Sequence, residues 1–203
     1  MNRTMQRFTN ISLLTLAMVG NAQAAILETI APDPFAFTEG VHFSVMAYSA
    51  PGDVAAPIVA VDLQLGFGNT STSGCDAADF SLFTAGGIAL MQRGFCPSAL
   101  KAENAAAAGA IGALIFNQGD TLDRVALFSD SLGPGYTGGI PVMSLSYIIG
   151  LELNVAAQKG FEMHMLVDEA DIGYAPVPGT VTLLGLGLAG LGIASCRRKV
   201  QAA

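Results

Sequence analysis

Short apolar runs separated by polar loops fill the middle of the chain, and the two ends are almost wholly apolar. The runs at residues 88–92, 111–117 and 140–145 are too short for helices and are bounded by turn-forming residues, so they predict buried strands. Residues 161–167 predict a final strand. These runs would form the core of one folded domain.

Before residue 66, apolar and polar residues alternate less regularly. Apolar runs at residues 41–48 and 57–65 predict two strands, and the Pro51-Gly52-Asp53 sequence between them predicts a turn. A polar loop rich in Gly, Ser and Thr follows at residues 66–74.

Two helices complete the expected pattern. Residues 97–108 begin with proline, continue with alanine and end at Gly109, and residues 146–159 begin with a capping serine and end at Gly160. The order of elements predicts an α/β (α+β) fold with a β-rich core and two or more flanking helices.

The N-terminal apolar end is typical of a secretory signal. Arg3 and Arg7 precede an apolar stretch at residues 11–20, and the Ala22-Gln23-Ala24 sequence suits signal peptidase. We expect residues 1–24 to be a signal peptide; the alternative is a buried N-terminal helix.

The C-terminal end combines an uncharged segment with a basic tail. Residues 181–196 predict a transmembrane segment, and the following residues 197–203 predict a cytoplasmic tail under the positive-inside rule. The alternative is a core helix, which a basic cluster directly after the apolar run disfavours.

Together with the preceding linker, residues 173–180, this end resembles the PEP-CTERM sorting signal of Gram-negative bacteria. The residues that carry the resemblance are a proline-containing motif and a terminal basic cluster: Val177, Pro178, Gly179 and Thr180, then Arg197, Arg198 and Lys199. The sequence V-P-G-T replaces the usual V-P-E-P. The resemblance implies an exosortase as partner, transient inner-membrane anchoring, and final placement at the cell surface or outside the cell.

Charge and composition narrow the functional classes. Only 12% of the residues are charged, against roughly 25% in an average soluble domain, which excludes a disordered chain. The net charge is −7, and removal of both ends would leave four cations against sixteen acids, a charge of −12. Nucleic acid is therefore not an expected partner.

Cys75 and Cys96 both lie in the segment expected outside the cytoplasm. Two thiols in an oxidising compartment predict a disulfide; a reactive cysteine or a metal pair are the alternatives.

The middle of the chain, residues 25–172, is the expected domain, and a second resemblance spans about residues 40–165 of it. An ordered set of segments at residues 74–80, 88–96, 101–110, 112–117 and 140–146 is similar to the protease-associated (PA) domain. Its motif positions, for which structural roles are expected, are Arg93, Gly94, Lys101, Asn104, Gly109, Gly112 and Asn117. Ser98 departs from the family, which usually has an aromatic residue there.

Catalytic motifs are not evident in the sequence. His42 and His164 each lie in an alternating apolar run, and no nucleophile elbow, zinc-protease helix, phosphate loop or EF-hand loop is present. Asp76 and Asp79 suit the capping of a turn or helix rather than metal binding. We therefore expect no enzyme activity, no metal and no cofactor.

Near the end of the middle segment, Asp168, Glu169 and Asp171 form a local acidic cluster. A solvated tether is the expected role, and weak calcium binding is the alternative.

The resemblance to the PA domain implies a module that accompanies peptidases and sorting receptors. We therefore expect a non-catalytic secreted or surface module that binds an unknown peptide or protein. Its binding rim would be formed by the loops at residues 66–74 and 118–139. The alternative is a structural acidic component of an extracellular matrix or biofilm, in contact with extracellular polysaccharide. A hydrolase dependent on His42 or His164 is a third possibility.

Overall fold

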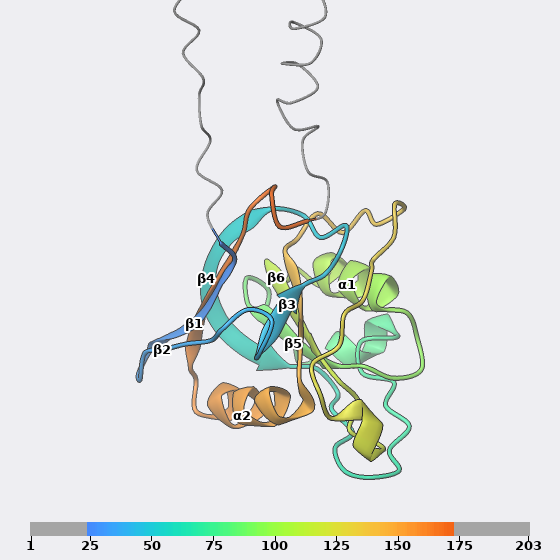
Figure 1. Cartoon of the computed structure of the whole chain (residues 1–203). Coiled ribbons are helices and arrows are strands. Elements are labelled where there is room, and N and C mark those ends of the chain that lie inside the picture. Colours follow the sequence, from blue (N-terminus) through green and yellow to red (C-terminus); the bar gives the residue numbers. More distant parts are fainter. Residues whose placement is uncertain (1–23, 173–203) are drawn as a thin grey trace, which may run out of the picture.

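The computed structural model describes residues 24–172 (Figure 1). Within this range, one sheet of eight strands has the order β2-β1-β8-β4-β5-β6-β7-β3. Its strands are β1 (Ile26–Ala31), β2 (Phe35–Ala36), β3 (Phe43–Val45), β4 (Gly52–Ala60), β5 (Ile88–Gln92), β6 (Gly112–Phe116), β7 (Val142–Leu145) and β8 (Glu162–Val167).

The sheet has a parallel part and an antiparallel part. Strands β4, β5, β6 and β7 run parallel, whereas β1, β2 and β8 pair antiparallel and β3 pairs antiparallel with β7. Strand β4 belongs to both parts, because its first six residues pair with β8 and its last three with β5. The sheet curves along β4 into a half-barrel (Figure 1).

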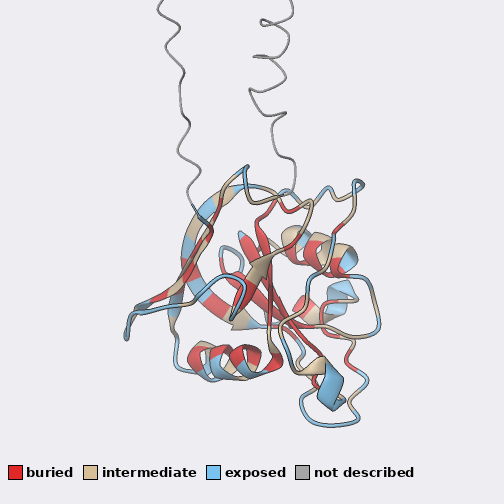
Figure 2. Cartoon of the chain, in the orientation of Figure 1, coloured by how far each residue is buried: buried red, intermediate tan, exposed pale blue. Residues whose placement is uncertain are grey.

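Two α-helices lie on opposite faces of the sheet (Figure 1): α1 (Ser98–Ala107) and α2 (Tyr147–Gln158). Along the central strands, alternate residues pack toward α1 and toward α2. Ala89 and Ile115 belong to the core cluster that contains α1, whereas Leu90 and Leu114 belong to the cluster that contains α2. Buried residues therefore follow each other without interruption along β5, β6 and β7 (Figure 2).

The expected α/β class and both expected helices are confirmed. The Ser146 Oγ accepts the backbone N–H of Ile149 at 3.3 Å, and Gly160, with φ of 73°, follows the end of α2. Gly109 follows α1 with φ of 88°, a conformation that glycine adopts without steric cost.

The N-terminal part of the expected pattern is partly wrong. Gly52 and Asp53 do not form a turn but begin β4, because β8 provides backbone partners for them. The strand expected at residues 57–65 ends at Ala60, and β1 was not expected at all. Pairing between segments far apart in sequence overrides the local preference of Gly and Asp for turns.

No helix within residues 24–172 is long and apolar enough to cross a membrane. The expected signal peptide, sorting linker, transmembrane segment and basic tail, including Val177 to Thr180 and Arg197 to Lys199, lie outside the described residues or, at residue 24, at their boundary.

Candidate functional site

The carboxyl ends of the four parallel strands meet at one edge of the sheet, and two long loops leave the sheet there. We call this edge, formed by residues 61–74 and 117–125, the loop rim. In Figure 1 the teal loop and the yellow 3-10 turn η2 (Leu122–Arg124) lie together at the bottom of the view. Ligand sites of open parallel sheets lie at this edge, because loops from neighbouring strands converge on it.

A buried glutamine at the end of β5 joins the two loops. Gln92 has no exposed surface; its Oε1 accepts the N–H of Gln64 at 2.9 Å, and its Nε2 donates to the carbonyl of Gln118 at 2.6 Å. Its own N–H donates to Ser73 Oγ at 3.1 Å. A satisfied buried amide fixes the relative position of the loops, since a broken bond would leave a buried polar group without a partner.

Further hydrogen bonds cross between the loops. Asn69 Nδ2 donates to the Gln118 carbonyl at 3.1 Å, Gln118 Nε2 donates to the Asn69 carbonyl at 3.1 Å, and the N–H of Gly68 donates to the Asp120 carbonyl at 2.9 Å. The two loops predicted as a rim are thus brought together in the structure. Asn69 and Gln92, which make these contacts, were not singled out from the sequence, although a glutamine in an otherwise apolar strand was a usable signal.

Apolar side chains project from the same rim. Phe67 is 71% exposed and Leu122 is 81% exposed. Beside them Arg124 Nη1 donates to Gln118 Oε1 at 2.6 Å and lies 3.7 Å from Asp120. Exposed apolar side chains mark a surface that another molecule covers where they form one contiguous patch, whereas scattered single ones do not.

The disulfide between Cys75 and Cys96 is confirmed, with an S–S distance of 2.06 Å. It connects the loop after Gly74 with the turn that follows β5. Next to it, Gly94 lies against the backbone of Ser71, and a Cβ at Gly94 would fall 2.0 Å from the Ser71 carbonyl oxygen. Only glycine fits this approach.

Helix α1 holds the loop around Cys75 through two polar side chains. Asn104 Nδ2 donates to the carbonyls of Gly74 at 3.0 Å and Cys75 at 2.9 Å. Lys101, which has no exposed surface, donates through Nζ to the carbonyl of Ser73. Burial lowers the pKa of Lys101 to about 8, although the negative charge of Asp79 opposes the shift.

The remaining motif positions lie at the ends of β5 and β6 or directly after them. Arg93 stacks over the Phe128 ring, with 4.8 Å from the guanidinium carbon to the ring centroid. Asn117, just after β6, donates through Nδ2 to the Ala126 carbonyl at 2.8 Å, and Gly112 begins β6 in the core. These contacts hold the backbone of the loops in place.

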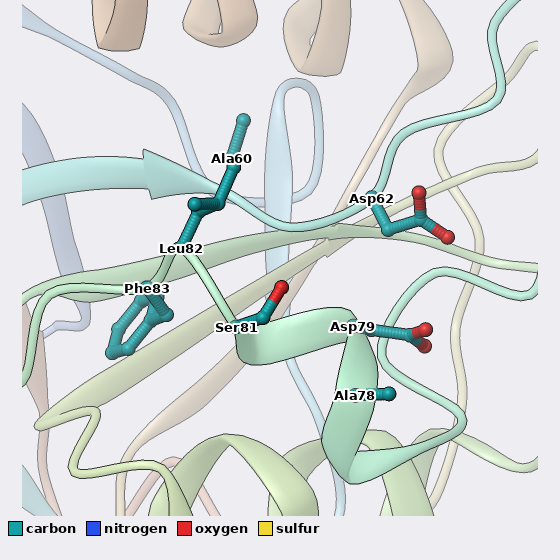
Figure 3. Close-up of a pocket in the computed structure, with 7 residues that line it drawn as sticks. All are labelled: Ala60, Asp62, Ala78, Asp79, Ser81, Leu82 and Phe83. Carbon is teal, nitrogen blue, oxygen red and sulfur yellow. The ribbon is translucent and has the colours of Figure 1, made fainter.

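A shallow pocket of about 280 Å³ lies near the ends of β4 and of η1 (Ala77–Phe80), and two aspartates contribute to it: Asp62 and Asp79 (Figure 3). Asp79 Oδ2 accepts the N–H of Asp76 at 3.1 Å, so these acids cap the short helix as the sequence indicated. Across residues 24–172 no group of three or more His, Cys, Asp or Glu side chains is placed to hold a metal ion.

The two histidines lie apart, in separate contacts. His42 Nδ1 accepts the N–H of Thr38 at 2.8 Å. His164, on β8, lies between Glu28 Oε1 at 3.0 Å and Asp53 Oδ1 at 2.8 Å. The hydrogen bond to Glu28, helped by Asp53 and opposed by burial, raises the pKa of His164.

The acidic cluster after β8 forms a local turn. The N–H of Asp168 donates to Asp171 Oδ2 at 3.0 Å, and the N–H of Glu169 donates to Asp168 Oδ1 at 2.6 Å. The carboxylates thus accept backbone hydrogen bonds within the turn.

Comparison with known proteins places this geometry in a family. Residues 54–153 match the PA domain. The chain is 47% identical over 142 residues to an aminopeptidase of Pseudomonas aeruginosa, a match that covers 70% of this chain and 26% of the relative. It is 32% identical over 104 residues to the probable lipoprotein aminopeptidase LpqL of Mycobacterium tuberculosis, covering 51% and 19% of the two chains.

Two solved aminopeptidase structures have a fold similar to that of this chain. The zinc aminopeptidase BSAP of Bacillus subtilis is 25% identical, with a TM-score of 0.51 over 70% of this chain and 29% of that one. An aminopeptidase from Aneurinibacillus sp. strain AM-1 has the same fold, with 23% identity and a TM-score of 0.52 over 71% and 30% of the two chains. The chain spans about a quarter of the length of the P. aeruginosa relative.

These comparisons overturn two expectations. The prediction of a non-catalytic interaction module or matrix component is wrong, and so is the prediction of no enzyme activity, because the relatives are named aminopeptidases. A search for catalytic motifs could not reveal this, since the similarity lies in the PA segment and not in a motif that carries chemistry. Residues 54–153 of this chain form a PA domain, and its relatives are aminopeptidases.

Proposed function

We propose that this chain contributes to aminopeptidase activity. It is the PA domain that lies beside a zinc peptidase unit, and that unit removes N-terminal residues from peptides. The observation that carries the proposal is the 47% identity over 142 residues to a P. aeruginosa aminopeptidase. Identity of that level across a whole folded unit supports an equivalent role for the domain. The fold shared with BSAP at 25% identity supports the association with a zinc enzyme.

The loop rim is the surface that we assign to contact with the peptidase unit. Phe67 and Leu122 project from loops whose backbones are fixed by Gln92 and Gln118, so the apolar surface is presented at little conformational cost. The hydrogen bond from the Gly66 N–H to Tyr147 Oη, at 3.0 Å, attaches the same loop to α2.

A domain exchange tests the proposal. Residues 24–172 would replace the matching segment of the P. aeruginosa aminopeptidase, and hydrolysis of leucine p-nitroanilide would be measured with zinc present. We expect the exchanged enzyme to remain active, whereas a deletion of the segment should lose activity. A soluble, zinc-loaded exchange variant that is as inactive as the deletion would contradict the proposal.

Variants within the exchanged enzyme test the surface. The Phe67→Asp/Leu122→Asp double variant should lower activity, because charges would disrupt an apolar contact. Val155→Asp, at a half-exposed position on α2, is the matched control and should leave activity unchanged. Equal activity of all three proteins would remove the loop rim from the proposal while leaving the domain's role intact.

We also propose that the chain is exported and processed at both ends, by signal peptidase and by an exosortase. The basic and apolar pattern of residues 1–24, the V-P-G-T sequence and the terminal basic cluster support this, and one relative is named a lipoprotein. Intact mass of the protein from its native host would test it. A mass that retains residues 181–203 would exclude the exosortase step.

A further inference from the structure

The two sulfurs of the Cys75–Cys96 disulfide lie in different surroundings. The Nζ of Lys101 is 3.5 Å from Cys75 Sγ, and the Lys101 side chain is fully buried. Cys96 instead lies in a turn whose neighbour, Phe95, is 87% exposed. Both cysteines are partly buried, but only the Cys75 sulfur has this contact with a buried ammonium group among the described hydrogen bonds.

The ammonium group affects what Cys75 would do without its partner. A positive charge in contact with a sulfur favours the thiolate over the thiol, and it does so more strongly where water is excluded. Although burial lowers the pKa of Lys101 to about 8, the group remains mostly protonated at neutral pH, and Asp79 adds to the preference for the charged form.

Cys96 is partly buried, as Cys75 is, and a pocket at the surface reaches it. It lines a pocket of about 260 Å³, together with Arg93, Gly94, Phe95, Pro97, Ser98 and Asp130. The two charges in this pocket have partners: Arg93 stacks on Phe128, and Asp130 Oδ2 accepts the Ser98 hydroxyl at 2.5 Å. The pocket is large enough for a small thiol.

Hydrogen bonds hold the backbone around both cysteines. Cys75 is anchored by its N–H, which donates to the Thr72 carbonyl at 2.8 Å, and by its carbonyl, which accepts Asn104 Nδ2 at 2.9 Å. The turn that carries Cys96 is attached through the N–H of Phe95, which donates to the Ser71 carbonyl at 2.9 Å, and through the Pro97 carbonyl, which accepts the N–H of Lys101 at 3.2 Å. A broken disulfide would therefore leave Cys75 in place beside Lys101.

We propose that this disulfide is a thiol-exchange site with a fixed direction, in which a small thiol attacks Cys96 from the pocket and Cys75 leaves as a thiolate beside Lys101. The attacking thiolate forms a new S–S bond with Cys96 Sγ, and the electron pair of the broken bond goes to Cys75 Sγ. A second thiol attacks the mixed disulfide, releases Cys96 as a thiolate and leaves as the oxidised reagent. Two reagent thiols are oxidised and one protein disulfide is reduced.

The direction can be measured on the unmodified protein. The full chain is mixed with 2-mercaptoethanol, quenched with acid at early times, and labelled with N-ethylmaleimide. The peptides that contain Cys75 and Cys96 are identified by mass spectrometry and told apart from that of the third cysteine, Cys196. We expect the mercaptoethanol adduct on Cys96 and the maleimide on Cys75, in about tenfold excess over the reverse. Adducts divided equally, or mainly on Cys75, would overturn the proposal.

Variants test the role of the ammonium group. Lys101→Met should slow the first step about tenfold, because the leaving thiolate loses its counter-charge, and Lys101→Arg should restore part of the rate. Lys159→Met, at the exposed end of α2, is the matched control. An unchanged rate in a folded Lys101→Met protein would contradict the proposal. If that variant does not fold, as judged by circular dichroism, the adduct position on the unmodified chain decides.

Discussion

The parallel and antiparallel parts of the sheet differ in how their strands are covered. Helices α1 and α2 lie on the two faces of the sheet at β5 and β6, and every residue of these two strands is buried. On β8, buried and less buried residues alternate, and the outer face carries His164 between Glu28 and Asp53. The parallel strands thus depend on apolar packing, whereas the antiparallel strands also carry a charged cluster on their outer face.

The largest expected effect comes from removing a leucine from each part. Leu114, on β6, has no exposed surface, so Leu114→Ala should lower the free energy of unfolding by about 3 kcal/mol through loss of contacts and creation of a cavity. Leu166, on the outer face of β8, is only partly buried, and Leu166→Ala should cost less than about 1 kcal/mol. Urea unfolding of both variants measures the difference. Equal losses would mean that the two parts are packed alike.

A glycine variant tests how tightly the loop edge of the parallel part is packed. A Cβ at Gly94 would meet the Ser71 carbonyl, so Gly94→Ala should cost about 2 kcal/mol by displacing backbone. Gly135 has open space around it and is the matched control, expected to change stability by less than about 0.5 kcal/mol. Thermal unfolding would reveal the contrast, and a stable Gly94→Ala protein would mean that this turn moves freely.

The smallest effect concerns the charged cluster of the antiparallel part. The folded protein raises the pKa of His164, so its contribution to stability is complete below the unfolded value of about 6.5 and is lost as pH rises through the higher folded pKa. His164→Gln should therefore destabilise the protein more at about pH 5.5 than at about pH 8.5. Glu28→Gln should weaken the pH dependence as well, because it removes the largest contribution to the shift. Urea unfolding at both pH values is the measurement, and equal losses for His164→Gln would contradict the assignment.

The candidate site was predictable only in part. The two loops of the rim and the Cys75–Cys96 pairing followed from loop composition and from the expected compartment. The contacts that fix the rim were not predictable, because Gln92, Asn69 and Gln118 meet only when separate strands lie side by side. The relation to aminopeptidases came from comparison with whole proteins, since the described domain carries no catalytic signature.

By itself the sequence determined the elements whose surroundings are uniform. Strands β5 and β6 and helices α1 and α2 follow from apolar runs, capping residues and terminal glycines, all of which act within a few residues of the chain. Tertiary structure alone decided that Gly52 and Asp53 begin a strand, that β1 exists, and that Lys101 lies against Cys75. Each of these depends on partners far away in sequence, and local preferences carry no information about such partners.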